Sequence, residues 1–135
     1  MKKLLLLLFL IPNLVMGASY LCIEDLSTGY IHDPKNQTAK KTDFLTAKWI
    51  IKKTNNIWRV YEFGKNEVSY GDCKPTYSLD NELTFISCDF GFQEFSFTKE
   101  TMRFIKINEG NWRQQEDGMF REIDTIVSIG KCSSI

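Results

Sequence analysis

The sequence predicts an all-β fold, either an antiparallel sandwich or a small closed barrel of about eight short strands with two disulfides. Three observations lead to this class. Short runs rich in aromatic and β-branched residues recur along the chain, turn residues separate them at short intervals, and no apolar pattern of helical period is sustained. Four cysteines, an even number, are spread over the same region. Many short strands with frequent turns are typical of sandwiches and barrels.

The clearest hairpin lies in the first half of the chain. Residues 47–52 and 57–63 alternate in the manner of strands, and Thr54, Asn55 and Asn56 supply the turn between them. Both faces of the second strand carry aromatic side chains, which predicts extensive burial. The other elements expected in this half are strands at 19–23, 30–31 and 68–70, the last a short edge piece, with turns at 27–29 and 33–36, a break at 64–66 and a loop at 71–75.

The second half of the chain repeats the pattern of short strands separated by turn residues. Phe95 and Phe97 fall on one face of their strand and Ser96 on the other, which predicts one buried face. Residues 113–118 are polar and acidic, as in a solvated loop. The strands expected here are 83–88, 94–98, 101–107 and 123–129, separated by turn residues at 80–81, 91 and 109–111.

The cysteines predict how the strands are tied. Four cysteines permit three pairings, and the sequence alone does not decide among them. Cys22 lies in the first strand and Cys132 at the end of the last, whereas Cys73 and Cys88 are close together in the middle. We therefore expect Cys22 to pair with Cys132 and Cys73 with Cys88, and the first of these bonds favours closure. No two cysteines have the short spacing of a zinc or redox motif.

The N-terminus predicts export. Lys2 and Lys3 precede an apolar run over residues 4–15, and the small residues Gly17 and Ala18 precede Ser19. This is the pattern of a secretory signal peptide, which we place at residues 1–18. The apolar run is too short and too interrupted for a membrane span, since about 20 residues are needed. We expect one disulfide-bonded domain over residues 19–135, soluble, monomeric, and periplasmic or extracellular.

The charge balance excludes one class of partner. Without Lys2 and Lys3, 15 of the 17 basic residues remain against 17 acidic ones. Nucleic-acid binding requires a basic stripe, and only isolated lysine doublets are present. We therefore expect no nucleic-acid partner. Because the sequence contains no recognisable cofactor or metal motif, we also expect no cofactor and no metal.

Several segments together suggest a resemblance. They are Tyr20-Leu21-Cys22, Ser27-Thr28-Gly29-Tyr30, Phe95-Ser96-Phe97, Met102-Arg103-Phe104 and Ile129-Gly130-Lys131-Cys132-Ser133. With these segments the chain resembles a group of small, uncharacterised secreted proteins of Gram-negative bacteria. The likeness spans most of the expected mature chain and implies the exported location and the β fold, but no activity.

In size and expected location the chain is also similar to periplasmic inhibitors of lysozyme, which are small β-barrels. Some of these inhibitors carry a Ser-Gly pair before a Tyr on a protruding loop. Ser27, Gly29 and Tyr30 supply the residue types with a different spacing. The alternative interpretation is a tight turn, with a positive φ at Gly29 and Tyr30 beginning the next strand.

Catalytic motifs are weak. His32, the single histidine, stands beside Asp33 and Pro34, as an exposed turn residue would. A serine–histidine–aspartate set can be assembled from distant positions in any sequence and indicates little. Two acidic pairs offer the carboxylates that acid–base hydrolysis requires, but neighbours in a polar loop are usually only solvated. These pairs are Glu116 with Asp117 and Glu122 with Asp124.

Two classes of function therefore remain. The first is a non-enzymatic binding or inhibitor module for an envelope or extracellular protein or glycan. Its contact residues would be Trp112 and Arg113, beside turn residues, together with Tyr30 and His32. The alternative for Trp112 is a plug at one end of the barrel. The second class is a small carboxylate-dependent hydrolase, and a structural envelope component is a third possibility.

Overall fold

The structure, a computed structural model, describes residues 18–33, 38–109 and 125–135. The described residues form nine strands, all paired antiparallel, and no helix. Among them no helix has the length and apolar character needed to span a membrane. The strands are β1 (Ser19–Asp33), β2 (Thr38–Asp43), β3 (Lys48–Thr54), β4 (Ile57–Glu62), β5 (Val68–Tyr77), β6 (Leu83–Phe90), β7 (Gln93–Thr98), β8 (Arg103–Asn108) and β9 (Thr125–Ser134).

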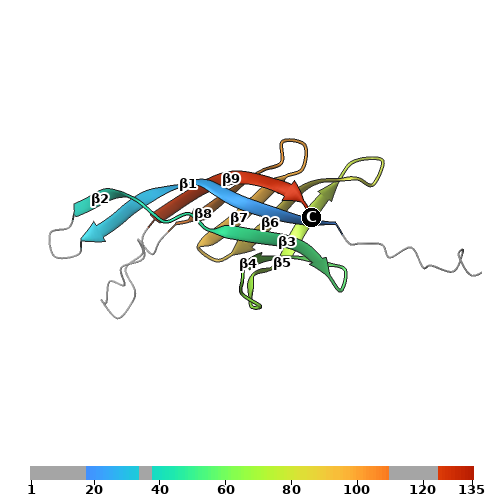
Figure 1. The fold of residues 1–135 in the computed structure, drawn as a ribbon, viewed down its shortest axis with the longest axis horizontal. Coiled ribbons are helices and arrows are strands. Elements are labelled where there is room, and N and C mark those ends of the chain that lie inside the picture. The colour runs from blue at the N-terminus through green and yellow to red at the C-terminus, as the bar shows by residue number, and fades with distance from the viewer. Residues whose placement is uncertain (1–17, 34–37, 110–124) are drawn as a thin grey trace, which may run out of the picture.

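Eight of the strands close into a barrel, one of the two architectures that the sequence predicted. From β3 to β9 each strand pairs with the next along the chain, and β1 pairs with both β3 and β9 to complete the circle. β2 is the additional strand, paired with the end of β1. In Figure 1 this pair extends beyond the body of the barrel, and the C-terminus lies near the start of β1 at the other end. Closure leaves the eight barrel strands without the open edges that invite pairing with other chains, whereas β2 pairs with β1 alone among the described strands.

The predicted hairpin is confirmed as β3 and β4. Asn55 and Asn56 have φ angles of 51° and 67°, the left-handed conformations of a two-residue turn that asparagine tolerates. The resulting register places Trp58 opposite Lys53 and Val60 opposite Ile51. Trp58 and Val60 are buried in the barrel, on one face of the strand.

The barrel interior is filled mainly by aromatic side chains. Phe95 and Phe97, predicted to share a buried face, are fully buried. The ring of Phe95 stacks on that of Phe104 at 5.1 Å, and the ring of Phe97 lies 4.8 Å from that of Tyr20. The buried core comprises Tyr20, Cys22, Trp49, Ile51, Trp58, Val60, Tyr70, Cys73, Ile86, Cys88, Phe95, Phe97, Phe104 and Cys132.

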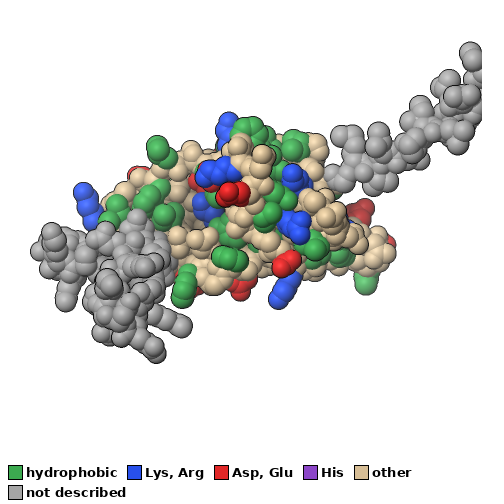
Figure 2. All heavy atoms as spheres, turned by 90° about the horizontal axis from the view of Figure 1, so that it is seen from below, with side chains coloured by type: hydrophobic (Ala, Val, Ile, Leu, Met, Phe, Trp, Pro, Cys, Tyr) green, Lys and Arg blue, Asp and Glu red, His purple; other side chains and the backbone are tan. Residues whose placement is uncertain are grey.

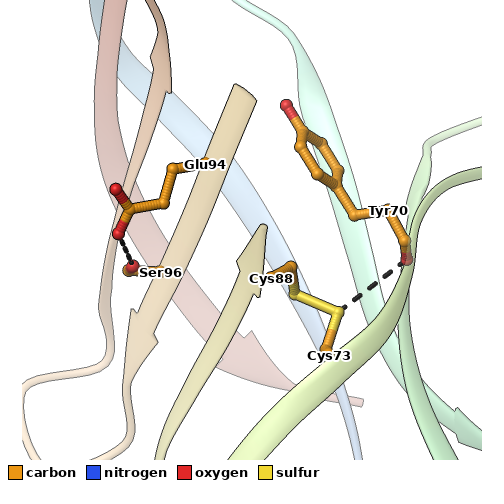
Figure 3. Close-up of a disulfide and its surroundings, with 5 residues drawn as sticks. All are labelled: Tyr70, Cys73, Cys88, Glu94 and Ser96. Atoms are coloured by element: carbon orange, nitrogen blue, oxygen red, sulfur yellow. Dashed lines mark hydrogen bonds between the residues drawn. A yellow bond between two sulfur atoms is a disulfide. The ribbon is translucent and has the colours of Figure 1, made fainter. Parts of the chain in front are cut away.

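Both predicted disulfides are present. Cys22–Cys132 joins β1 to β9, where the barrel closes, and Cys73–Cys88 joins β5 to β6. Figure 3 shows the second bond, with the Tyr70 ring directed away from it. The Cys73 sulfur lies 3.8 Å from the Tyr70 carbonyl oxygen, a packing contact because a disulfide sulfur carries no proton. Two formed disulfides fit an oxidising environment.

The turn predicted at residues 27–29 is wrong. β1 runs without interruption from Ser19 to Asp33, and Gly29 does not have a positive φ. Gly29 is needed for a different reason. A Cβ at this position would collide with the backbone carbonyl oxygen of Thr125, so glycine permits the close approach of β1 and β9.

The loop predicted at residues 71–75 is also wrong. β5 continues through it, pairing with β4 up to Cys73 and with β6 from Lys74 onward. Asp72, at a φ of 53°, lies between Tyr70 and Cys73, where the register of β5 against β4 shifts. Pro75 lies opposite Ile86 on β6 and beyond Cys73, the last residue of β5 that pairs with β4. Because β4 does not pair with β5 at this position, the missing N–H of the proline costs no hydrogen bond on that side of the strand.

Candidate functional site

β1 changes its partner at a bulge, and the site is built around this point. Residues 19–23 pair with β3, whereas 28–33 pair with β2. The register against β9 shifts between Glu24 and Leu26. The connection from β2 to β3 follows the same edge, since Phe44 N donates to Ser27 O at 2.8 Å and Glu24 N to Ala47 O at 3.0 Å. We call residues 28–33 together with β2 the arm, and the bulge is its base.

A buried carboxylate lies at this base. The Glu24 side chain is 1% exposed, inside the barrel. Its Oε2 accepts a bond from Ala47 N at 2.9 Å, and its Oε1 accepts one from Trp49 Nε1 at 2.8 Å. An isolated charge at this depth would be strongly unfavourable, so these donors are needed to hold it.

Lys106 on β8 supplies the compensating charge. Its Nζ lies 2.9 Å from Glu24 Oε1 and 4.3 Å from the centroid of the Trp49 ring. The lysine is therefore held by an ion pair and a cation–π contact together. We call Glu24, Trp49 and Lys106 the polar cluster. It connects β1, β3 and β8 around the base of the arm.

Tyr70 completes the surroundings of the cluster. Its ring lies 6.1 Å from that of Trp49 and 5.7 Å from that of Phe95. Burial raises the pKa of the Tyr70 hydroxyl to about 12, and the negative charge of Glu24 adds to the effect. The hydroxyl is consequently neutral at pH 7 and is no candidate for a general base.

A hydroxyl pair and close backbone contacts extend the packing along β1 and β9. Ser27 and Ser128 are both buried, with their hydroxyl oxygens 2.8 Å apart. Gly130 lies opposite Glu24, where a Cβ would collide with Ile23 O and come within 2.6 Å of the Phe104 ring. Among the described residues every buried side-chain nitrogen and oxygen has a hydrogen-bond partner. The base of the arm is therefore a closely packed region in which every buried polar side chain is hydrogen-bonded.

The arm itself presents an exposed aromatic side chain. Tyr30 is 50% exposed and pairs with Lys41 on β2 and Thr125 on β9. It lines a small hollow of about 130 Å³, almost wholly apolar. The other residues lining it are Thr28, Gly29, Lys41, Thr125 and Val127.

Two of the four predicted contact residues lie on this arm. Tyr30 is exposed there, and the backbone of His32 pairs with that of Ala39 on β2. Trp112 and Arg113 lie outside the described residues, so their role as a contact stays a prediction. The acidic pairs Glu116 with Asp117 and Glu122 with Asp124 also lie outside them.

The sequence reasoning missed the polar cluster. One signal was present in the alternation of β8. Lys106 lies two residues after the buried Phe104, so both side chains are on the same face of the strand and are directed into the barrel. Its partner could not be identified in the same way. Glu24 is 82 residues away, and the bulge after it changes which side of β1 faces inward.

Carboxylates share a surface depression elsewhere. Asp72 and Asp89 line an open hollow of about 570 Å³ together with Lys74 and Ser87. Both aspartates are exposed. The described residues contain no group of three or more histidine, cysteine or acidic side chains that could hold a metal ion.

Fold and site together define a small, closed, disulfide-bonded antiparallel barrel with a projecting arm. Comparison with protein-family models, with curated proteins and with solved structures found no match to this chain.

Proposed function

We propose that this protein is an exported, non-enzymatic binding module that contacts its partner through the arm. The observation that carries the proposal is the exposed Tyr30 beside an apolar hollow between β1, β2 and β9, at the place where β1 and β2 extend beyond the barrel. Aromatic side chains at well-packed positions contribute disproportionately to binding. A contact surface of this kind needs a rigid support, which the polar cluster at the base supplies.

The packing of the barrel favours binding over catalysis. The aromatic core occupies the interior, and the buried carboxylate is already bonded to Lys106, Trp49 and the Ala47 amide. Asp72 and Asp89, which share a depression, are exposed, whereas a general acid in a hydrolase needs a shielded environment. Nothing about the described carboxylates favours the hydrolase.

Export is supported from two directions. The N-terminal residues have the pattern of a secretory signal, and the two disulfides fit an oxidising compartment. The partner would then be a component of the envelope or of the extracellular medium. Ser27 is buried against Ser128, so contact by this segment relies on Tyr30 and its neighbours.

Capture from envelope extract tests the proposal. The oxidised protein beginning at Ser19 is immobilised, and the retained components are compared for the wild type, Tyr30→Ala and Phe63→Ala. Phe63 is a matched control because it is 54% exposed and follows β4 outside the arm. We expect Tyr30→Ala to lower retention at least tenfold and Phe63→Ala to leave it unchanged. Equal retention by all three folded proteins would refute the assignment to the arm.

A further inference from the structure

A strip of aliphatic side chains adjoins the hollow on the same face of the sheet. Ile105 lies opposite Ile129, and Ile129 opposite Leu26. Residues directly opposite in an antiparallel pair share a face, with their Cβ atoms about 5 Å apart. All three are exposed large apolar residues. One step along the same face, Ile107 lies opposite Val127 and Val127 opposite Thr28.

The strip and the hollow are continuous because they share Val127. We define the apolar strip as Leu26, Ile105, Ile107, Val127 and Ile129. Thr28, Tyr30 and Thr125, which line the hollow, follow on the same face by the same register. On the face seen in Figure 2, by contrast, apolar side chains are dispersed among basic and acidic ones. The strip is thus a coherent apolar surface on a small barrel.

The hollow has the size of one apolar side chain. Its volume is about 130 Å³, and a cavity of about 150 Å³ is enough to hold a benzene molecule. Gly29 lines it with its backbone, because a Cβ at that position would be directed at the Thr125 carbonyl oxygen and not into the hollow. A leucine, isoleucine, methionine or phenylalanine side chain of a partner would fit such a space.

The charge beside the hollow places a second requirement on the partner. Lys41 lines the hollow and is exposed, so an anionic group beside the inserted side chain would be attracted. At the other end of the strip Arg103 lies opposite Lys131, and both are exposed. Acidic residues also adjoin this surface. Asp43 on β2 and Glu94 on β7 lie opposite Thr28 and Ile107 respectively. Asp25 is exposed beside Leu26, and Glu109 is exposed next to Thr125, whose Oγ1 donates to the Glu109 carbonyl oxygen. Lys41 is the basic side chain that lines the hollow itself, which makes it the residue that would attract such a group.

We propose, on the basis of the function given above, that the partner is a protein that inserts an apolar side chain, flanked by a carboxylate, into the hollow beside Tyr30. A glycan fits this surface poorly. Sugar hydroxyls would lose water against the almost wholly apolar lining and the aliphatic strip and would gain few hydrogen bonds there, which is unfavourable for each unpaired buried group. An aliphatic protein side chain gains from the same transfer.

Small probes of defined chemistry test this inference without the natural partner. The backbone amide spectrum of the labelled, oxidised protein is recorded by NMR during titration with two capped tetrapeptides, Ala-Leu-Glu-Ala and Ala-Ser-Glu-Ala, and with chitotetraose. We expect the leucine peptide to shift the amides of Gly29, Tyr30 and Val127 and to bind at least about fivefold more tightly than the serine peptide, since burying a side chain of this size gives such a factor. Chitotetraose should leave these amides unshifted.

Three variants test whether the hollow is responsible. Val127→Phe places a larger side chain at the wall of the hollow and should abolish the leucine-dependent shifts, whereas Phe63→Ala should preserve them. Replacing the glutamate of the peptide by glutamine should weaken binding to the wild type and leave binding to Lys41→Ala unchanged.

Three results would overturn the inference: shifts of these amides with chitotetraose, no preference for leucine over serine, or self-association through this face shown by sedimentation. These results are distinguishable from a failure of the binding function. If Tyr30→Ala abolishes capture but the leucine peptide shows no preference, the arm is the contact surface and its partner is of another chemistry. If Tyr30→Ala leaves capture unchanged, the arm has no such function.

Discussion

Lys106 and Glu24 form an ion pair inside the barrel, with Nζ 2.9 Å from Oε1, although 82 residues separate them in the sequence. The pair lies where β1 leaves β3 and pairs with β2, so it connects barrel stability to the position of the arm. Its energetic role differs from that of a surface ion pair. Both charges are largely withdrawn from water, and each depends on the other for compensation.

Removing Lys106 should therefore destabilise the protein strongly. In Lys106→Met the Glu24 carboxylate stays buried with two neutral donors, and we expect a loss of about 3 kcal/mol in the free energy of unfolding. The double variant Glu24→Gln/Lys106→Met should recover part of this loss. Urea denaturation measures all three, and Lys65→Met is the control. Lys65 pairs with Glu62 at 2.6 Å on the surface, and its loss should cost under about 1 kcal/mol. Equal effects of the two lysine substitutions would contradict a buried, coupled pair.

Titration of Tyr70 should be displaced to high pH. The pKa of its hydroxyl is about 12 in the folded protein against 10.0 when unfolded, so between pH 10 and pH 12 the unfolded state loses the proton first. Stability contributed by the neutral hydroxyl is complete below pH 10 and is lost as the pH rises through 12. Ultraviolet absorbance of tyrosinate should show a late step that Tyr70→Phe removes. Burial also raises the pKa of Tyr20, whose contribution should remain in that variant.

The two disulfides should contribute unequally. Cys22–Cys132 spans 110 residues and Cys73–Cys88 only 15. In the chain-entropy description, loops of these lengths stabilise by about 4.7 and about 3 kcal/mol. Pairwise replacement by alanine, followed by thermal and urea denaturation, should show the greater loss for the bond that closes the barrel. A greater loss for Cys73–Cys88 would contradict the entropic description.

Glycine should be required at position 130 for steric reasons. A Cβ there would collide with Ile23 O, come within 2.6 Å of the Phe104 ring and lie 2.8 Å from the Glu24 Cα. We expect Gly130→Ala to lower the free energy of unfolding by at least about 2 kcal/mol, as overpacking does. Gly71→Ala is the matched control, because its Cβ would make only an ordinary contact with Val68. A near-neutral Gly130→Ala would mean that β1 and β9 are less closely packed than described.

The features that could be predicted from the sequence depend on local patterns. Alternation predicted the shared face of Phe95 and Phe97 in β7, Asn55 and Asn56 predicted the hairpin turn, and the positions of the cysteines along the strands predicted both disulfides. In each case the relevant partners are neighbours in sequence or follow from the order of the strands. For β4 the aromatic residues on both faces predicted extensive burial, whereas Ile57 and Phe63 on one face are exposed.

The features that were missed depend on contacts between distant segments. Gly29 indicated a turn because glycine is the usual turn residue, whereas here it permits the approach of the Thr125 carbonyl oxygen. The bulge after Glu24 leaves Asp25 and Leu26 both exposed and breaks the alternation that would have shown which residues face inward. The hollow beside Tyr30 likewise needs β1, β2 and β9 in register.

Site-specific photo-crosslinking tests the central claim, that the arm is the contact surface, most directly. A benzophenone amino acid is introduced at position 30 or, as the control, at position 63, and each protein is irradiated in envelope extract. Our account predicts a discrete adduct from position 30 and none from position 63. Adducts of equal yield from both positions, or an adduct from position 63 alone, would contradict it.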